Sequence, residues 1–354
     1  MDKVPFLTDP GMSMKHAYAR FKMAESLNLF LIFNMKALGL FVVFSAIVLS
    51  GGAATKPFSE PDSLVAESDS LGKKFITIAP EKVVFREVGK LPKVLREASG
   101  LQRSDSGYFW SHNDDGVPAL YCLDSLGNQV KAVQLNVSNK GWEDLTRDES
   151  GNFYIGGFGN NKNDRKELRI YRIPNPDDLE APLTNPEIIT YSYEDQKVFP
   201  ASKSNKNFDA DAFFAWKGNL YLFTKNRSSP FKGISKIYRL SQEPGNQSAK
   251  LIDSLFVGTG PMINNWITSA DLSPDGKTLA LLFHDRILFI RNFTEDRFSR
   301  GAIYELKLNH YSHKAGICWT TNNKLYIVDE LELDVLGGKM YSVDLSVVWK
   351  DRKS

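Results

Sequence analysis

A short phrase that recurs five times along the chain constrains its fold more than any other feature. Four to six residues after each copy comes a Gly or Asn turn, and a second apolar segment follows the turn. The copies lie roughly 45–70 residues apart, an interval typical of repeat architectures. A β-rich unit that cannot bury its own faces, repeated around a ring, is a propeller blade. The copies are Glu97–Leu101, Trp142–Leu145, Asp209–Phe213, Thr268–Leu272 and Lys314–Ile317.

The segments between the turns have the composition of short strands, rich in β-branched and aromatic residues. The last repeat runs out of chain near Trp349, and we expect its missing strand from residues 75–78 or 83–85. Closure by an N-terminal strand would remove the exposed edges of an open sheet. We therefore predict an all-β propeller of four-stranded antiparallel blades over residues 74–350. Five blades are favoured, and six stay possible because the interval between Leu145 and Phe213 is long.

Charge and the N-terminal segment bear on partners and location. A formal net charge of +2, with both signs well mixed, does not imply a nucleic-acid partner. Within residues 1–54, Met35-Lys36 precedes an apolar run and small residues, which is typical of a signal peptide and makes Met35 a possible true start. Alternatively, residues 27–49 form an uncleaved membrane anchor. Residues 55–73 have the composition of a linker, so we expect an extracytoplasmic propeller, periplasmic or secreted, with membrane contact only through the N-terminal segment.

Acidic residues recur where the first strand of a repeat begins, positions that should converge at one rim of the central channel. Converging carboxylates repel one another unless a cation neutralises them or their pKa values rise. Oxygen ligands without Cys or clustered His favour Ca²⁺ or Mg²⁺. The alternative is that each acid caps a turn or pairs with a nearby Arg or Lys. The candidate metal ligands are Glu97, Glu143, Asp144, Asp211 and Asp271.

The repeat phase divides these acids into two groups. Asp144 and Asp271 both stand one residue before a Leu of the phrase, which favours a repeated structural role. Glu143 and Asp211 stand one residue earlier, so strand alternation should turn them to the other face.

Polar residues at the ends of second strands form a second candidate group, for a small ligand, a glycan or a partner protein at the rim. Amides and carboxylates could meet a sugar or a carbonyl group, Arg side chains an anionic group, and a histidine could act as a base. Turn chemistry and ion pairs are the alternatives. The sequence holds no nucleophile elbow, phosphate-binding loop or zinc motif. The candidates are Asn113, Asp114, Asn160, Asn161, Arg165, Asn226, Arg227, His284 and Asp285.

Two stretches carry a family resemblance: Glu97-Ala-Ser-Gly-Leu101 with Trp110-Ser-His-Asn-Asp114, and Trp142-Glu-Asp-Leu145 with Tyr154-Ile-Gly-Gly-Phe-Gly-Asn-Asn161. They resemble exported bacterial propellers similar to the SdiA-regulated and NHL-repeat propellers and, distantly, to the gluconolactonase and regucalcin group. The distant resemblance implies a divalent ion at the channel mouth, with Glu97, Asp211 and Asp271 as the matching positions. Asp211 stands where that group has Asn.

Two functions are consistent with these patterns, beside a third alternative of a scaffold with no small-molecule site. The first is binding at the channel mouth, with or without a structural divalent cation. The second is a metal-dependent hydrolase acting on a lactone, an ester or a phosphoester.

Overall fold

The computed structural model describes residues 75–179 and 183–349. The chain divides into a unit of residues 1–65 and a unit of residues 66–354, and every described residue belongs to the second unit. The predicted signal peptide or anchor (1–54) and the predicted linker (55–73) lie outside the described residues. None of the helices in the described ranges has the length and apolar character needed to span a membrane.

The first sheet follows the first repeat. Its four main strands pair antiparallel in chain order, and the short strand β10 adds to the outer edge in parallel. The strands are β3 (Ala98–Arg103), β4 (Phe109–Asn113), β5 (Ala119–Leu123), β6 (Gln129–Leu135) and β10 (Leu183–Thr184).

The second and third repeats form two further antiparallel units. They join into one eight-stranded sheet because their outer strands, β11 and β15, pair in parallel. The second unit contains β7 (Asp144–Arg147), β8 (Phe153–Gly157), β9 (Leu168–Ile173) and β11 (Glu187–Tyr193), and the third contains β12 (Asp209–Trp216), β13 (Asn219–Lys225), β14 (Ile234–Ser241) and β15 (Gly245–Phe256).

The last two repeats each receive a strand from the N-terminal side. Strand β1 (Ile76–Thr77) pairs in parallel with β19, and β2 (Val84–Lys90) pairs antiparallel with β24 in the last sheet. The fourth unit contains β16 (Ser269–Leu272), β17 (Thr278–Leu282), β18 (Arg286–Arg291) and β19 (Ala302–Lys307), and the last sheet contains β20 (Lys314–Thr321), β21 (Lys324–Asp329) and β24 (Lys339–Asp344).

Only short elements accompany these sheets within the described residues. They are the hairpin β22 (Leu331–Glu332) and β23 (Leu336–Gly337) and the 3₁₀ helices η1 (Pro80–Lys82), η2 (Pro176–Asp178), η3 (Lys203–Asn205), η4 (Met262–Asn265) and η5 (Phe298–Arg300).

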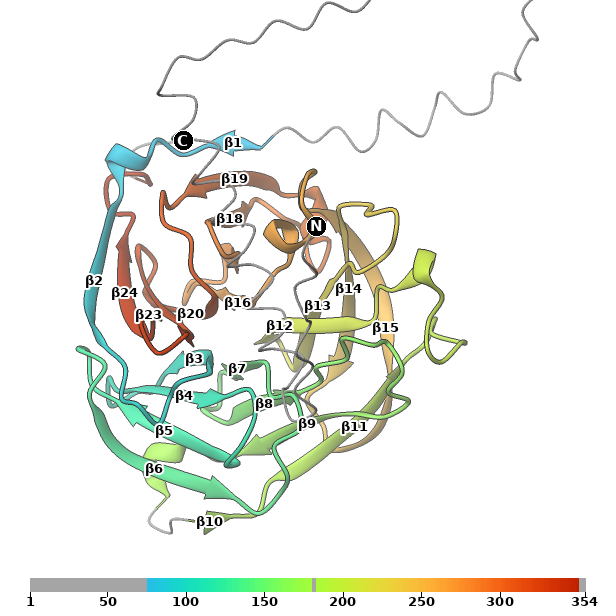
Figure 1. Cartoon of the computed structure of the whole chain (residues 1–354), viewed down its shortest axis with the longest axis horizontal. Coiled ribbons are helices and arrows are strands. Elements are labelled where there is room, and N and C mark those ends of the chain that lie inside the picture. The colour runs from blue at the N-terminus through green and yellow to red at the C-terminus, as the bar shows by residue number, and fades with distance from the viewer. Residues whose placement is uncertain (1–74, 180–182, 350–354) are drawn as a thin grey trace, which may run out of the picture. The chain divides into compact units, whose positions relative to one another are not determined.

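The innermost strands close on themselves around a common centre (Figure 1). Strands β3, β7, β12, β16 and β20 contact one another in this order, and β20 contacts β3 again. A buried apolar cluster fills each junction between neighbouring sheets, including the junction of the first and last sheets, where Leu101 and Tyr121 meet Val328 and Met340. Full burial of one such large apolar side chain stabilises the fold by about 1.5–3 kcal/mol. The prediction of an all-β propeller is therefore confirmed.

Glycines allow the inner strands to approach one another closely. A Cβ atom on Gly100, whose φ is +69°, would lie 2.6 Å from the backbone nitrogen of Leu145. A Cβ atom on Gly316 would lie 2.7 Å from the carbonyl carbon of Gly100. Because only glycine lacks this atom, the first and last copies of the phrase carry glycine where the backbones of their inner strands meet.

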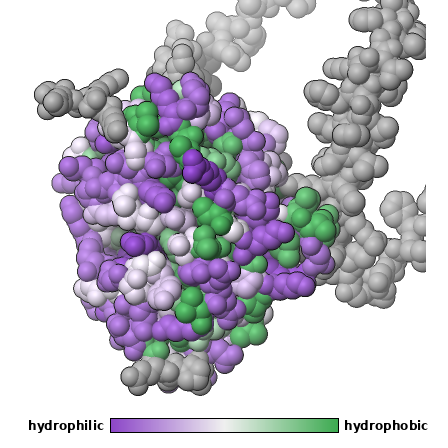
Figure 2. All heavy atoms as spheres, turned by 90° about the vertical axis from the view of Figure 1, so that its left-hand side faces the viewer, coloured by the Kyte–Doolittle hydropathy of each residue, from purple (hydrophilic) through white to green (hydrophobic). Residues whose placement is uncertain are grey.

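Figure 2 shows the side of the described unit that faces left in Figure 1, and hydrophilic residues cover most of it. Apolar residues on this face are scattered among polar ones. Single exposed apolar residues of this kind are ordinary on soluble domains. The view therefore offers no broad apolar docking surface.

Candidate functional site

A buried ion pair stands at the end of the channel where the inner strands begin, which we call the channel mouth. Strand β12 starts at Asp209 opposite Lys225, the last residue of β13, and a bulge between Ala210 and Ala212 leaves Asp211 outside the regular register. The Lys225 ammonium contacts the Asp211 carboxylate, with only 6% and 12% of the two side chains exposed. The Asp211 carboxylate, which the sequence analysis predicted to be a metal ligand, thus contacts the ammonium group of a lysine.

Carboxylates from three repeats surround the Lys225 ammonium. Burial and, to a smaller extent, the Arg227 charge lower the pKa of Lys225 to about 8, against the opposing effect of the Glu143, Asp209 and Glu330 carboxylates. The Glu143 carboxylate lies against the backbone of Gly159, since a Cβ there would fall 2.0 Å from Glu143 Oε1. The mouth therefore combines acids of the second, third and last repeats around one lysine.

A second acid–base pair lies beside the first. Arg227 Nε donates to Asp209 Oδ2 at 2.5 Å, and another Arg227 nitrogen donates to Asn161. The Arg227 guanidinium lies 4.0 Å from the centre of the Trp266 ring, and the Lys225 ammonium lies 5.5 Å from the same ring. Trp266 is held in place by a 3.0 Å hydrogen bond from its indole nitrogen to the carbonyl oxygen of Asn226. Cations over an indole face gain a favourable electrostatic attraction.

Two histidines extend the mouth towards the last repeat. His313 Nδ1 lies 3.2 Å from Glu330 Oε2, and the His313 and His284 rings meet edge to face at 5.0 Å. Burial opposes protonation of His313, but the Glu330 carboxylate raises its pKa above the ordinary value. Tyr311, with 48% of its surface exposed, lies 5.8 Å from His284. The cluster thus contains a histidine that can hold a proton near neutral pH.

Asp144 lies deeper, inside the channel. Its Oδ2 accepts from the backbone nitrogen of Phe213 at 3.1 Å, and its Oδ1 accepts from the Ser269 hydroxyl at 2.8 Å. Burial raises the pKa of Asp144 well above its ordinary value, although these hydrogen bonds oppose the shift. The side chain therefore joins three inner strands, as the structural interpretation of its repeat phase predicted.

The contacts of Asp271 show that it does not occupy the position of Asp144 in the repeat, as predicted, but a position two residues further along the strand. Asp271 Oδ2 accepts from the Trp319 nitrogen at 2.7 Å, and Thr146 Oγ1 accepts from the Ala215 nitrogen at 3.1 Å in the same way. Asp271 therefore corresponds to Thr146, whereas Asp144 corresponds to Ser269, which accepts from the Ile317 nitrogen. A shift of two residues leaves a side chain on the same face of a strand but moves it along the channel.

Glu97 groups with other acids than those predicted. Its carboxylate and those of Asp114 and Asp115 offer oxygens within 4.8 Å of one another, the one such group of three in the described ranges. Asn113 holds the start of the strand, since its Oδ1 accepts from the Glu97 nitrogen at 3.0 Å and its Nδ2 donates to Val94. The structure does not bring the five predicted metal ligands together.

Several predicted ligand-binding residues hold loops instead. The Asn160 side chain donates to Phe208 and accepts from the nitrogens of Asp164 and Arg165. Arg165 donates to the carbonyl oxygens of Gly159 at 2.6 Å and Gly157 at 3.0 Å. Asp285 pairs with Arg286 at 3.1 Å. For these residues the contacts agree with the alternative of turn chemistry and ion pairs.

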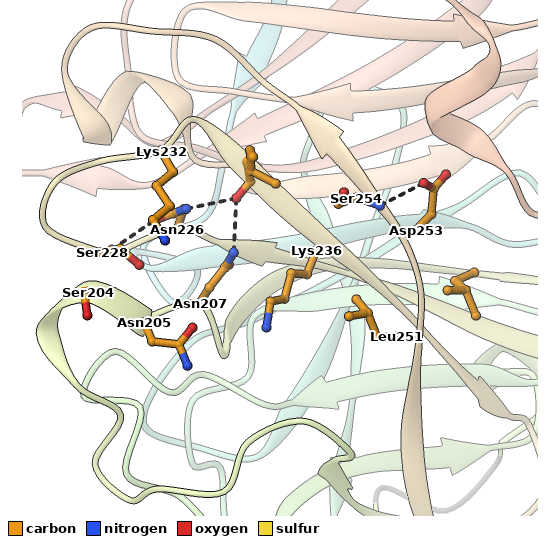
Figure 3. Close-up of a pocket in the computed structure, with 12 residues that line it drawn as sticks. Ser204, Asn205, Asn207, Asn226, Ser228, Lys232, Lys236, Leu251, Asp253 and Ser254 are labelled. Carbon is orange, nitrogen blue, oxygen red and sulfur yellow. Dashed lines mark hydrogen bonds between the residues drawn. The ribbon is translucent and has the colours of Figure 1, made fainter. Parts of the chain in front are cut away.

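Asn226 lines a hollow of about 470 Å³ whose wall includes residues of β14 and β15 (Figure 3). Asn207 and Asn226 both donate to the carbonyl oxygen of Ile234 at 3.2 Å. Lys236 Nζ on the same wall binds Asp195 at 2.5 Å. Because these polar groups are satisfied by the protein, the hollow gives no sign of a specific ligand.

The sequence interpretation missed Lys225, Trp266, Glu330 and His313 as members of the site. Lys225 ends the second strand β13 and Glu330 follows the second strand β21, so their position in the repeat was an available signal. Trp266 and His313 lie in the loops that lead into β16 and β20, where no repeated pattern marks them.

No protein-family model matches the chain, and a search of curated proteins gave no match either. Among solved structures, a virginiamycin B lyase from Staphylococcus aureus is 14% identical over 72% of this chain and 68% of its own, with a TM-score of 0.36. A gluconolactonase from Xanthomonas campestris is 12% identical over 70% and 71% of the two chains, with a TM-score of 0.38. At these identities the likeness concerns the fold alone.

A third solved structure is a calcium-bound carbohydrate-active enzyme of family AA12 from Trichoderma reesei. It is 9% identical over 76% of this chain and 97% of its own, with a TM-score of 0.44. Gluconolactonases thus stand among the structures to which this chain is distantly similar, as the weaker resemblance implied. The finer assignment to SdiA-regulated or NHL-repeat propellers stays a prediction.

Proposed function

We propose that this protein is a five-bladed β-propeller that binds a small polyhydroxylated ligand, of the sugar class, at the channel mouth. One observation carries the proposal: the buried pairs Lys225–Asp211 and Arg227–Asp209 lie beside the same indole ring. A hydroxyl group both donates and accepts, so it can bind to a carboxylate and to a cation held at fixed positions. Trp266 and Tyr311 add aromatic surface with polar ends.

The blade count is part of the proposal. Five inner strands contact one another in a closed order, and a buried apolar cluster fills each junction between consecutive units. Pairing of β2 with β24 gives the last sheet its fourth strand. A sixth blade would need a further inner strand between β7 and β12, and these two strands contact each other directly.

The proposed location and partners of the protein rest on the expectations drawn from its sequence. We propose that residues 1–54 export the propeller as a signal peptide or hold it at a membrane as an anchor. The polar face of Figure 2 fits a protein whose partner is a small ligand or a glycan at the rim rather than an apolar surface.

The predicted metal ligands do not fit a shared divalent ion. Asp144 and Asp271 use their oxygens to accept backbone and hydroxyl hydrogens, and Asp211 contacts Lys225. We propose that the Lys225 ammonium neutralises the converging carboxylates in place of a Ca²⁺ or Mg²⁺ ion. With its pKa at about 8, Lys225 is mostly charged at neutral pH and can both satisfy Asp211 and donate to a ligand.

Hydrolysis is a second candidate, favoured by the pair His313–Glu330. A histidine oriented by a carboxylate 3.2 Å away has the arrangement of a general acid–base group. In that case the group would act on a lactone or an ester held beside Lys225. Saturable ligand binding without turnover separates the binding protein from this hydrolase.

The test is calorimetry of the full chain with a panel of neutral mono- and disaccharides, on the wild type, Arg227→Met and Arg239→Met. Arg239 pairs with Asp296 at 2.6 Å on β14, away from the mouth, so its variant is a matched control. A hydrogen bond from a charged donor contributes about 1.5–3 kcal/mol, so Arg227→Met should weaken binding at least about tenfold. The proposal fails if the wild type binds no saccharide, or if both variants bind equally.

A further inference from the structure

The hairpin of β22 and β23 carries apolar side chains into solvent beside the channel mouth. It directly follows Glu330, whose carboxylate contacts His313 at the mouth. Leu333, Val335 and Leu336 are each at least half exposed, and no other five consecutive residues in the described ranges hold three exposed large apolar side chains. A cluster of this kind differs from the single exposed apolar residues that are ordinary on soluble domains.

The turn of this hairpin places a leucine where the backbone disfavours one. Leu333 and Asp334 have φ values of +53° and +62°. Tight hairpin turns with two left-handed residues prefer Asn and Gly, because a Cβ atom is strained in that conformation. Since half of the Leu333 surface stays exposed, burial within the described protein does not offset this strain. A strained residue without such compensation indicates a role outside the packing of the chain.

Contacts with the segment that precedes β3 hold the hairpin in place. The Leu331 nitrogen donates to the Arg96 carbonyl oxygen at 2.7 Å, and the Leu91 nitrogen donates to the Gly338 carbonyl oxygen at 2.8 Å. At the tip, the Arg96 guanidinium contacts the Asp334 carboxylate. The apolar side chains are therefore presented at a defined position on the rim.

One face of the hairpin is turned towards the mouth. Glu332 and Leu336 are direct partners in the ladder of β22 and β23, so their side chains lie on the same face. Glu332 Oε1 lies 3.9 Å from His313 Nδ1, which places this face beside the histidine. Tyr311, on the loop that leads into β20, adds an exposed ring. The apolar surface of Leu336 thus borders the polar site at the mouth.

We propose that the ligand at the mouth is a glycoside with an apolar aglycone. Its sugar binds beside Lys225 and Arg227, and its alkyl or aryl group lies against Leu336 on the hairpin. This inference rests on the proposed sugar site and names the class of ligand more closely. Covering an exposed leucine with an apolar group removes both surfaces from water and favours binding. The exposed acids Glu332 and Asp334, which stand among the apolar side chains, disfavour a lipid bilayer as the occupant.

Calorimetry on the full chain tests this inference with the methyl and octyl β-glycosides of glucose and galactose, kept below the concentration at which they form micelles. The readout is the ratio of the methyl to the octyl dissociation constant, which isolates the contribution of the alkyl chain. Leu336→Ser removes the apolar contact, and Arg227→Met removes the sugar contact. The matched control is Leu126→Ser, since Leu126 is 56% exposed against 57% for Leu336 and lies in the turn between β5 and β6, away from the mouth.

We expect a ratio of at least about ten in the wild type, because burial of a large apolar group changes affinity by that order. Leu336→Ser should lower the ratio at least about threefold, whereas Leu126→Ser should keep it. Arg227→Met should weaken both glycosides of the bound sugar by a similar factor and so keep the ratio as well. The unfolding temperature of Leu336→Ser should match that of the wild type, because the side chain is exposed.

Two results would overturn this inference and leave the proposed sugar site standing. One is binding of a methyl glycoside with a ratio near one in the wild type. The other is a high ratio that persists in Leu336→Ser, which would place the alkyl chain elsewhere. If octyl glycoside binding is lost in Leu336→Ser but unchanged in Arg227→Met, the sugar site itself is wrong and no glycoside bridges the two surfaces. Absence of all glycoside binding contradicts both proposals.

Discussion

The Asp144 carboxylate accepts a 2.8 Å hydrogen bond from the Ser269 hydroxyl, and this bond joins two inner strands that are not neighbours in the ring. The same carboxylate accepts from the backbone of Phe213 on the intervening strand and of Ala270 beside Ser269. Side chains that tie three inner strands at one level make the centre of the propeller a packed channel. The two ends of that channel are then free to have different chemistry.

Asp144→Ala should destabilise the protein more than a typical core polar substitution. It leaves the Phe213 and Ala270 nitrogens and the Ser269 hydroxyl without their acceptor, at about 1–3 kcal/mol for each buried group. We expect the free energy of unfolding to fall by about 3–5 kcal/mol in denaturant titrations. Asp164→Ala, at an exposed loop position, is the control and should change it by less than about 0.5 kcal/mol. Similar losses in both variants would contradict the role given to Asp144.

Asp271 should make stability fall as pH rises through the acid range. Burial raises its pKa to about 7, against the opposing hydrogen bonds from the Trp319 and Leu272 nitrogens. Because the folded state binds this proton more tightly than the unfolded state, the group's stabilising effect is present below about pH 4 and is lost towards pH 7. Between about pH 4 and pH 7, the free energy of unfolding of the wild type should therefore fall relative to that of Asp271→Asn. A difference that stays flat from pH 4 to 7 would show that Asp271 keeps an ordinary pKa.

Gly316→Ala tests the closure of the ring. The added Cβ would lie 2.7 Å from the carbonyl carbon of Gly100 on β3, so β20 and β3 would have to separate. Overpacking of this kind costs about 1–3 kcal/mol or more, and the unfolding temperature should fall clearly. Gly218→Ala is the comparison, since nothing lies within 4 Å of its Cβ and only its φ of +74° opposes the change. If Gly218→Ala proves the more damaging variant, the first and last sheets do not pack as described.

The repeat pattern was sufficient to predict the class of fold, because each blade carries its own strands and turns. The phrase also placed Asp144 on an inner strand with a structural role. It could not show that the counterpart of Asp144 is Ser269 rather than Asp271. The two repeats were aligned on the nearest Leu, and an error of two residues in that alignment leaves a side chain on the same face of the strand.

The site was harder to predict because it depends on contacts between repeats. A bulge in β12 turns Asp211 to Lys225, and bulges of this kind leave little trace in a single sequence. Of the recurring acids, Glu143 and Asp211 lie at the mouth, whereas Asp144 and Asp271 lie further along the channel. The cation that meets Asp211 comes from β13 of the same repeat, while Glu143 and Glu330 come from others, and no spacing rule links them.

Thermal unfolding of the full chain with EDTA or with Ca²⁺ tests most directly whether Lys225 takes the place of a metal ion. We compare the wild type with Lys225→Met and Asp211→Asn, and we include Glu97→Gln to identify any response of the Glu97, Asp114 and Asp115 group. We predict that Lys225→Met is less stable in EDTA and is stabilised by Ca²⁺, since binding to the native state raises stability by mass action. Any stabilisation of the wild type by Ca²⁺ should persist in Asp211→Asn. A wild-type response to Ca²⁺ that persists in Glu97→Gln and disappears in Asp211→Asn would place a metal ion at Asp211 and contradict the account.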